Sequence, residues 1–190
     1  MIRLALLRHG HTPWNRAHRI QGRSDIPLDA EAEDTLRALR LPPPWDRTDM
    51  VASPLSRAMQ TGVLLGGSPA AEPALMEMDW GDWEGRRGAD LRAELGNGFP
   101  DIEAWGWEWA PPGGESPATL RTRLIPWAER LASDTVAICH IGVMRVLLAH
   151  ASGWDFDGPA PFAVKRNRLY VIEIGTHWRA WPEPVRLEPR

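Results

Sequence analysis

The sequence predicts an α/β fold with buried parallel strands, and three stretches predict it. Each is a short apolar run that leads through a turn into a helical segment: residues 2–7, 50–53 and 135–139. Mainly apolar runs of this length are typical of strands covered on both faces of a parallel sheet. The first and third runs end in His9 and His140, and a glycine follows each histidine within two residues. Because open α/β sheets bind ligands at the carboxyl ends of their strands, we expect a ligand site there.

Length and composition fit one globular domain spanning residues 1–190. The chain has 43% hydrophobic and 25% charged residues, which argues against both disorder and a membrane-spanning protein. Its formal charge of -3, without a basic cluster, gives no footprint for nucleic acid. The apolar stretch after Met1 is only about six residues long, too short for a targeting segment, so we expect a cytoplasmic protein.

Two scarce residue types narrow the chemistry. The single cysteine, Cys139, excludes an internal disulfide and a cysteine-rich metal site, and its apolar run favours a buried structural role. Among the 22 basic residues only Lys165 is a lysine, so no P-loop lysine follows a glycine-rich turn. We therefore expect arginine to bind any phosphate group.

The first strand, residues 2–7, delivers Arg8 and His9 to the expected crevice. Arg8 offers a planar fork of donors that suits phosphate, and Gly10 lets the backbone approach an anion closely. His9 is then a nucleophile, a proton carrier or a ligand. Surface capping of the strand end is the competing interpretation of this tripeptide.

A loop rich in turn-forming residues, 21–28, leads to a helix over about residues 30–40. Asp29 is its predicted N-cap, and the prolines at 42–44 stop it. Its apolar side is formed by Ala32, Leu36, Leu39 and Leu41.

After the second apolar run, Pro54 opens a helix that continues to Gly66. Ser53 is placed as its N-cap, which would be a structural role for this serine. Arg57 lies one turn into the helix and faces the same crevice as Arg8.

Residues 72–88 are expected to form a strand or extended segment that breaks at Gly81. Glu77 lies between two methionines, and a carboxyl group in apolar surroundings is a candidate for a raised pKa. An exposed position on the edge of a pleated strand is the alternative for Glu77. Residues 99–112 carry several tryptophans among prolines and glycines and are interpreted as a packed loop or lid beside the site.

The last third of the chain continues the same architecture. Ser116 and the proline after it begin a helix that runs to about residue 132. An apolar helix over residues 143–150 follows Gly142, and its first amides could add anion binding. Residues 168–174 are expected to form a last strand, and an edge position in the sheet is one alternative for it. The proline-rich tail is expected to be irregular.

Several short motifs follow one another along residues 2–150. They are Arg8-His9-Gly10 with Thr12 and Asn15, Gln21-Gly22, Ser53-Pro54-Leu55-Ser56-Arg57-Ala58 with Thr61, Leu75-Met76-Glu77 running into Gly81-Asp82-Trp83-Glu84-Gly85, Gly114-Glu115-Ser116, and His140-Ile141-Gly142. Together these motifs resemble the histidine phosphatase superfamily, the group of phosphoglycerate mutases and related phosphatases. The resemblance implies a three-layer α/β/α sandwich with a mostly parallel central sheet, and a phosphohistidine mechanism without metal or other cofactor.

The resemblance implies roles that also agree with the chemistry of the residues. His9 attacks phosphorus and becomes a phosphohistidine, which splits one hard displacement into two. Arg8, Arg57 and His140 surround the equatorial phosphoryl oxygens, where charge is spread in the transition state. Glu77 protonates the leaving oxygen and later takes a proton from water. The implied substrate contacts are Arg8, Asn15, Gln21, Gly22, Arg57 and Gly142.

We therefore expect a phosphoric monoester hydrolase that acts on a small phosphorylated metabolite. Phosphoglycerate mutase-type transfer is the alternative, but a mutase must keep water from its intermediate, which favours a longer cover than the segment from Gly85 to Gly114. One position departs from the family: His11 stands where members more often carry Glu, Gln or Thr. This departure bears on the substrate and leaves the chemistry intact.

Two alternatives come from other functional classes. His9 and His11 point to one side of the strand end and could begin the site of a metal-dependent hydrolase. The arginines in the same crevice would repel a cation, which disfavours that site. A catalytically silent phosphate-binding module is disfavoured because every position needed for chemistry is occupied.

Overall fold

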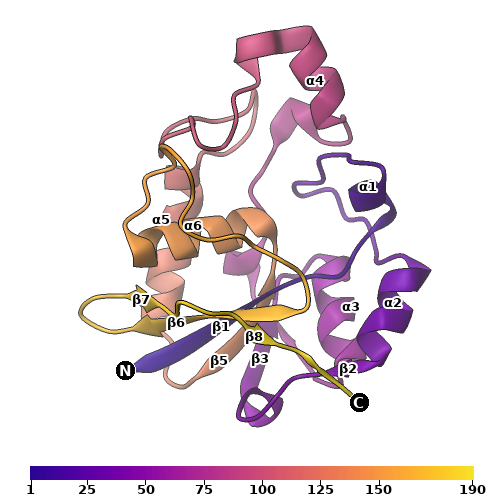
Figure 1. The fold of residues 1–190 in the computed structure, drawn as a ribbon, viewed down its shortest axis with the longest axis vertical. Coiled ribbons are helices and arrows are strands. Elements are labelled where there is room, and N and C mark those ends of the chain that lie inside the picture. Colours follow the sequence, from indigo (N-terminus) through magenta and orange to yellow (C-terminus); the bar gives the residue numbers. More distant parts are fainter.

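A central sheet of seven strands organises the chain, for which the computed structural model describes residues 1–190. The strands are β1 Ile2–Arg8, β3 Asp49–Ala52, β4 Ala70–Ala71, β5 Thr135–Cys139, β6 Arg168–Ile174, β7 Arg179–Ala180 and β8 Val185–Arg186. Their order is β4, β3, β5, β1, β6 and β7, with β8 also paired to β6 (Figure 1). The strands from β4 to β1 are parallel, and β6 is antiparallel to its neighbours. The predicted central sheet is therefore confirmed.

Six α-helices connect and cover these strands. They are α1 Pro13–Arg16, α2 Ala30–Arg37, α3 Ser56–Leu64, α4 Gly88–Leu95, α5 Pro117–Glu129 and α6 Ile141–Ser152. Two of them, α5 and α6, lie on one side of the sheet, and α2 and α3 lie on the other (Figure 1). None of the helices is long and apolar enough to cross a membrane.

The side chains of β1 alternate between two hydrophobic cores. Leu4 and Leu6 belong to the core under α5 and α6, whereas Ala5 and Leu7 belong to the core under α2 and α3. Successive side chains of a strand point to opposite faces, so a strand with both faces covered must be apolar throughout. This is why residues 4–7 are all apolar, and it confirms the three-layer α/β/α sandwich.

The carboxyl ends of three parallel strands meet at one edge of the sheet. β1 pairs with β5 up to the register Arg8 with Cys139, and the amide of His9 then donates to the carbonyl of Cys139 at 3.0 Å. On the other side of β5, the amide of Ser53 donates to the carbonyl of Ile138 at 2.9 Å. The residues that follow these strands are thus brought to one edge, as open α/β sheets require.

Local predictions fail at two helix boundaries. α2 ends at Arg37, because the next residues form β2, Leu39–Arg40, which pairs with β9, Glu188–Pro189. Ser53 does not cap α3, which begins at Ser56; instead its Oγ accepts the amide of Leu55 at 3.4 Å.

Strand pairing overturns two further expectations. β6 is not an edge strand, since β1 lies on one side of it and β7 and β8 on the other. The tail is likewise not irregular, because it supplies β7, β8 and β9. No strand forms over residues 72–88, where short 3₁₀ turns at Pro73–Leu75 and Gly81–Trp83 flank an extended link. Further 3₁₀ turns occur at Trp45–Arg47 and Gly96–Gly98.

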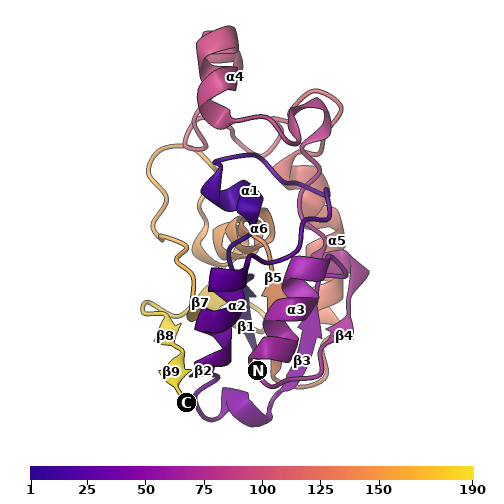
Figure 2. The ribbon, with the colours of Figure 1, turned by 90° about the vertical axis from the view of Figure 1, so that its right-hand side faces the viewer.

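Residues 81–115 form a cap above the carboxyl edge of the sheet, with α4 at its far end (Figures 1 and 2). Its tryptophans Trp105 and Trp109 stack at 4.5 Å between ring centroids, and Trp80, just before the cap, meets Trp105 edge-on at 5.4 Å. Aromatic packing therefore helps to hold the cap together.

Candidate active site

His9 lies immediately after β1 and is only 3% exposed. Its Nδ1 is 2.6 Å from the carbonyl oxygen of Gly10. Because a carbonyl only accepts, Nδ1 carries the proton and Nε2 keeps its lone pair. Burial holds the pKa of His9 well below its usual range, and the neighbouring His140, Arg57 and Arg8 lower it further. His9 is thus a neutral imidazole with a nucleophilic nitrogen available.

Two arginines flank this imidazole with unused donors. Arg8 makes no side-chain hydrogen bond, and its Nε is buried without a partner. Burial lowers the pKa of Arg8 to about 10, against the opposing effect of Glu77. Arg57 is fully buried in the first turn of α3, where its two terminal nitrogens donate to the carbonyls of Ser24 and Gly22, each at 2.7 Å. Its Nε has no partner, so both guanidinium groups can still bind an anion.

His140 follows β5 as His9 follows β1. Its ring centroid lies 5.1 Å from that of His9, with the planes inclined at 57°. The side chain is fully buried, and neither ring nitrogen has a hydrogen-bond partner. Burial, with the charges of Arg57 and Arg8, keeps its pKa well below the usual value. The neutral ring of His140 can therefore donate one hydrogen bond from one nitrogen and accept another at the other, next to His9.

Glu77 reaches the site from the extended link before the cap and is 5% exposed. Its carboxyl oxygens accept the amides of Met78 at 2.9 Å, Gly142 at 3.1 Å and Val143 at 3.2 Å. Burial raises its pKa, although these amide bonds and the nearby arginines oppose the shift. The edge-of-strand alternative for Glu77 is therefore wrong, and the carboxyl is poised to exchange a proton nearer neutral pH.

The start of α6 is shaped to hold Glu77. A Cβ atom on Gly142 would lie 2.4 Å from Oε1 of Glu77, so only glycine permits this close approach. Arg123 supports the same segment by donating to the carbonyl of Glu77 at 3.2 Å. The sequence left open that the first amides of α6 add to anion binding, and in the structure those of Gly142 and Val143 face the carboxyl of Glu77.

The loop after α1 supports the site from the opposite side. The Oγ of Thr12 donates to the side-chain carbonyl of Gln21 at 2.8 Å, and its amide donates to that of Asn15 at 3.1 Å. Gly22 lends its carbonyl to Arg57 and adopts a positive φ of 51°. Asn15, Gln21 and Gly22 are thus engaged with protein partners that position the loop and Arg57.

The comparison with known families decides what kind of site this is. The model of the histidine phosphatase superfamily, branch 1, matches residues 4–181 of the chain. The chain belongs to this superfamily. Its members work through a phosphohistidine intermediate. The family predicted from the sequence is confirmed, and so is the enzyme class, a phosphoric monoester hydrolase of the histidine phosphatase type.

Individual relatives of this histidine phosphatase cover most of its length. It is 30% identical to the glucosyl-3-phosphoglycerate phosphatase of Mycolicibacterium vanbaalenii, over 96% of the chain and 88% of the relative. It is 31% identical to the adenosylcobalamin/alpha-ribazole phosphatase of Salmonella typhimurium, over 82% of the chain and 85% of the relative. The crystal structure of a phosphoglycerate mutase from Thermus thermophilus superposes with a TM-score of 0.76 at 30% identity, over 98% of the chain and all of the mutase.

The structure of this histidine phosphatase places one further residue at the candidate active site, which the sequence did not reveal. Arg166 donates from Nε to the carbonyl of His9 at 3.1 Å and from Nη2 to the side-chain oxygen of Asn15 at 2.9 Å. Burial and the charge of Arg8 lower its pKa to about 9. Arg166 reaches the site because it lies just before β6, which runs antiparallel to β1 and therefore begins where β1 ends. Local sequence does not show that these two strands pair.

His11 lies two residues beyond His9 and is partly exposed. Its carbonyl accepts the amide of Asp29 at 3.0 Å, and burial lowers the pKa of its ring. No group of three or more histidine, cysteine, aspartate and glutamate side chains in the structure is arranged to hold a metal ion.

Proposed function

We propose that this histidine phosphatase hydrolyses a small phosphorylated metabolite through a phosphohistidine on His9. One observation carries the proposal: every buried side-chain nitrogen or oxygen without a hydrogen-bond partner belongs to Arg8, Arg57 or His140. An unpaired buried polar group costs about 1–3 kcal/mol, so such groups rarely gather without a ligand. A phosphoryl group supplies acceptor oxygens for the arginine donors and for the ring N–H of His140.

In the first step, the lone pair on Nε2 of His9 attacks phosphorus, and the bond from phosphorus to the ester oxygen breaks. Glu77 gives its proton to the departing oxygen, and its raised pKa keeps that proton available at higher pH than in an exposed glutamate. The donors of Arg8, Arg57 and His140 stabilise the charge on the three equatorial oxygens. Loss of one such donor typically slows a reaction by about 10²–10³.

In the second step, water attacks phosphorus and the bond from phosphorus to Nε2 breaks. The carboxylate of Glu77 takes the proton from the water, and orthophosphate leaves. This restores the protonated carboxyl and the neutral imidazole. The hydrogen bond from Nδ1 of His9 to Gly10 keeps the ring in one tautomer and orientation, so the same nitrogen serves both steps.

Phosphoglycerate mutase-type transfer is the second candidate, and the likeness to the Thermus thermophilus mutase favours it. The likeness to two phosphatases favours hydrolysis. We propose hydrolysis as the main reaction because the cover over the site is the small cap of residues 81–115, whereas a mutase must shield its phosphohistidine from water while the intermediate turns. A cytoplasmic location and the lack of a nucleic-acid partner stay predictions.

The partition between water and a second hydroxyl group tests this function. The protein is incubated with 3-phosphoglycerate primed by 2,3-bisphosphoglycerate, and in parallel with a panel of phosphorylated metabolites. Isomer formation and free phosphate are followed together. The proposal expects phosphate release to exceed isomerisation for every substrate, and isomerisation far outrunning phosphate release would make the protein a compact mutase.

A further inference from the structure

Glu84 belongs to a motif of the cap that the proposed reaction does not use. It directly follows the 3₁₀ turn Gly81–Trp83 and is partly buried. Its Oε1 accepts the amides of Arg23 at 2.7 Å and Trp80 at 3.3 Å. Its Oε2 accepts the amide of Ser24 at 2.8 Å and the hydroxyl group of the same serine. A carboxylate with four donors holds the segment that supplies them.

Three of these four donors come from the loop that carries Arg57. The terminal nitrogens of Arg57 donate to the carbonyls of Gly22 and Ser24, each at 2.7 Å. Gly22 also lies against the carboxylate, because a Cβ atom at this position would be 1.9 Å from Oε1 of Glu84. Glu84 and Arg57 therefore bind the same short loop, Glu84 through its N–H groups and Arg57 through its carbonyls.

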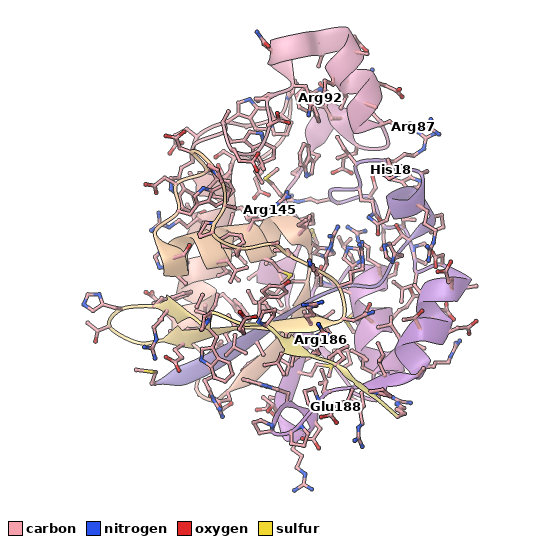
Figure 3. The ribbon with its side chains drawn as sticks, viewed as in Figure 1. His18, Arg87, Arg92, Arg145, Arg186 and Glu188 are labelled. Carbon is pink, nitrogen blue, oxygen red and sulfur yellow. The ribbon has the colours of Figure 1, made fainter.

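The backbone next to Glu84 joins the cap to the loop after α1. The amide of Gly85 donates to the carbonyl of Ile20 at 2.7 Å, and the amide of Ile20 donates to the carbonyl of Arg86 at 2.9 Å. Figure 3 shows Arg87 of the cap close to His18 of the loop, next to this junction. The carboxylate thus reaches residues 22–24 only when this part of the cap lies in place.

We propose that Glu84 is a positioning residue for Arg57, and that through it phosphate binding depends on the cap being in place. The inference rests on the proposed function, in which Arg57 binds the phosphoryl group. One rigid unit links the two side chains: the planar peptide group between Gly22 and Arg23 gives its N–H to Glu84 and its carbonyl to Arg57. A carboxylate at one end of this peptide also strengthens the hydrogen bond at the other end.

The sign of the charge separates positioning from a direct electrostatic effect. Burial lowers the pKa of Arg57, and the nearby acids Glu77, Asp25 and Glu84 raise it. A negative charge near the site opposes the binding of an anion, so removing that charge alone should tighten phosphate binding. Weaker binding after the loss of Glu84 therefore indicates displaced donors.

Arg23 offers a competing route from the same loop to Glu77. Its Nε lies 3.5 Å from the carbonyl of Glu77, and one terminal nitrogen lies 3.3 Å from Glu115. If the loss of Glu84 acted by moving Arg23, it would disturb the acid and slow alkyl phosphates more than aryl phosphates. An effect through Arg57 should slow both alike, because every phosphomonoester carries the same phosphoryl group.

The test is a double-mutant cycle of Glu84→Gln and Arg57→Gln, with thermal melts of each variant. Calorimetry measures the dissociation constant of inorganic phosphate, and steady-state kinetics measures kcat/KM for 4-nitrophenyl phosphate and glycerol 2-phosphate. Glu84→Gln should weaken phosphate binding and lower both kcat/KM values about 10- to 100-fold, as a misplaced group does. In the Arg57→Gln protein the same substitution should cost less than about threefold, because residues that act as a unit are not additive.

Two further variants separate charge from position. Asp82→Asn is the matched control: Asp82 lies in the 3₁₀ turn just before Glu84, is exposed, and makes no side-chain hydrogen bond or ion pair. It removes the same charge and should leave binding and both rates unchanged. Glu84→Asp keeps the charge but withdraws the carboxylate from the loop, so it should weaken phosphate binding in the same direction. It takes the place of Glu84→Gln in the cycle if that protein does not fold.

Three results would overturn the proposal. They are equal losses from Glu84→Gln in the parent and in the Arg57→Gln protein, tighter phosphate binding in Glu84→Gln, and a loss on glycerol 2-phosphate far greater than that on 4-nitrophenyl phosphate. Failure of the proposed function is separate. A protein that binds inorganic phosphate but releases none from any ester would refute hydrolysis, and the binding cycle would still decide the role of Glu84.

Discussion

Replacing Glu77 by glutamine removes a proton and keeps the shape of the side chain. Its carboxyl accepts three amide hydrogen bonds, two at Oε1 and one at Oε2. The amide oxygen of glutamine can keep the two bonds from Met78 and Val143, but its NH₂ group then faces the amide of Gly142, donor against donor. Losing that one bond should lower the free energy of unfolding by about 1–3 kcal/mol, so the variant still folds.

The effect of Glu77→Gln on rate should depend on the leaving group. Alkyl phosphates need a proton on the departing oxygen, so kcat/KM for glycerol 2-phosphate should fall by about 10²–10⁴. The leaving group of 4-nitrophenyl phosphate needs little help, and its kcat/KM should fall less than about tenfold. Steady-state kinetics on both substrates, with thermal melts, measures the difference. Glu103 is an exposed acid of the cap, and the control variant Glu103→Gln should leave kcat/KM unchanged for both substrates.

Equal losses on the two substrates in Glu77→Gln would refute the reasoning, because a structural role does not distinguish leaving groups. An unchanged rate on glycerol 2-phosphate would refute it as well.

Two further predictions concern the same cluster. His9 and His140 stay neutral in the folded protein but titrate near 6.5 when unfolded, so lowering the pH from 7.5 to 5.5 should cost about 1.4 kcal/mol of stability per histidine. Glu77, whose pKa is raised, changes stability with pH in the opposite sense, and denaturant melts of His140→Asn should show the dependence reduced by one histidine. Gly142→Ala places a Cβ 2.4 Å from Oε1 of Glu77 and 3.2 Å from Cβ of Met78, and should lower kcat on alkyl phosphates by at least about tenfold by displacing the acid. A crystal structure of that variant with Glu77 unmoved and normal activity would count against this.

The parts of the fold that the sequence predicts well are those in which one short stretch carries its own signal. Residues 4–7 and 136–139 are apolar at every position because both faces of these strands are covered, so their burial is readable without knowing their neighbours. Parallel pairing then brings His9 and His140 to the same edge of the sheet. The Asp29 cap of α2 is equally local, since its side chain accepts the amide of Ala32 at 2.8 Å.

The predictions that failed depend on pairing between segments, which no single stretch of sequence shows. β2 ends α2 early because β9, more than 100 residues away, pairs with it. β6 is an inner strand because β7 and β8 from the tail cover the side that β1 leaves open. Arg166 joins the site only through that placement of β6. The burial of Glu77 was likewise undecided, since an acid between two methionines reads the same on an exposed edge as under a cap.

The central claim is that His9 carries the phosphoryl group, and trapping the intermediate tests it most directly. The protein is mixed briefly with a ³²P-labelled phosphomonoester, denatured in alkali and digested, and the labelled peptide is identified. The account predicts label on His9 that is stable in alkali and labile in acid, absent from His9→Ala together with turnover, and present in the neighbouring control His11→Ala. A His9→Ala protein that turns over at the rate of the parent, or label on another residue, would contradict it.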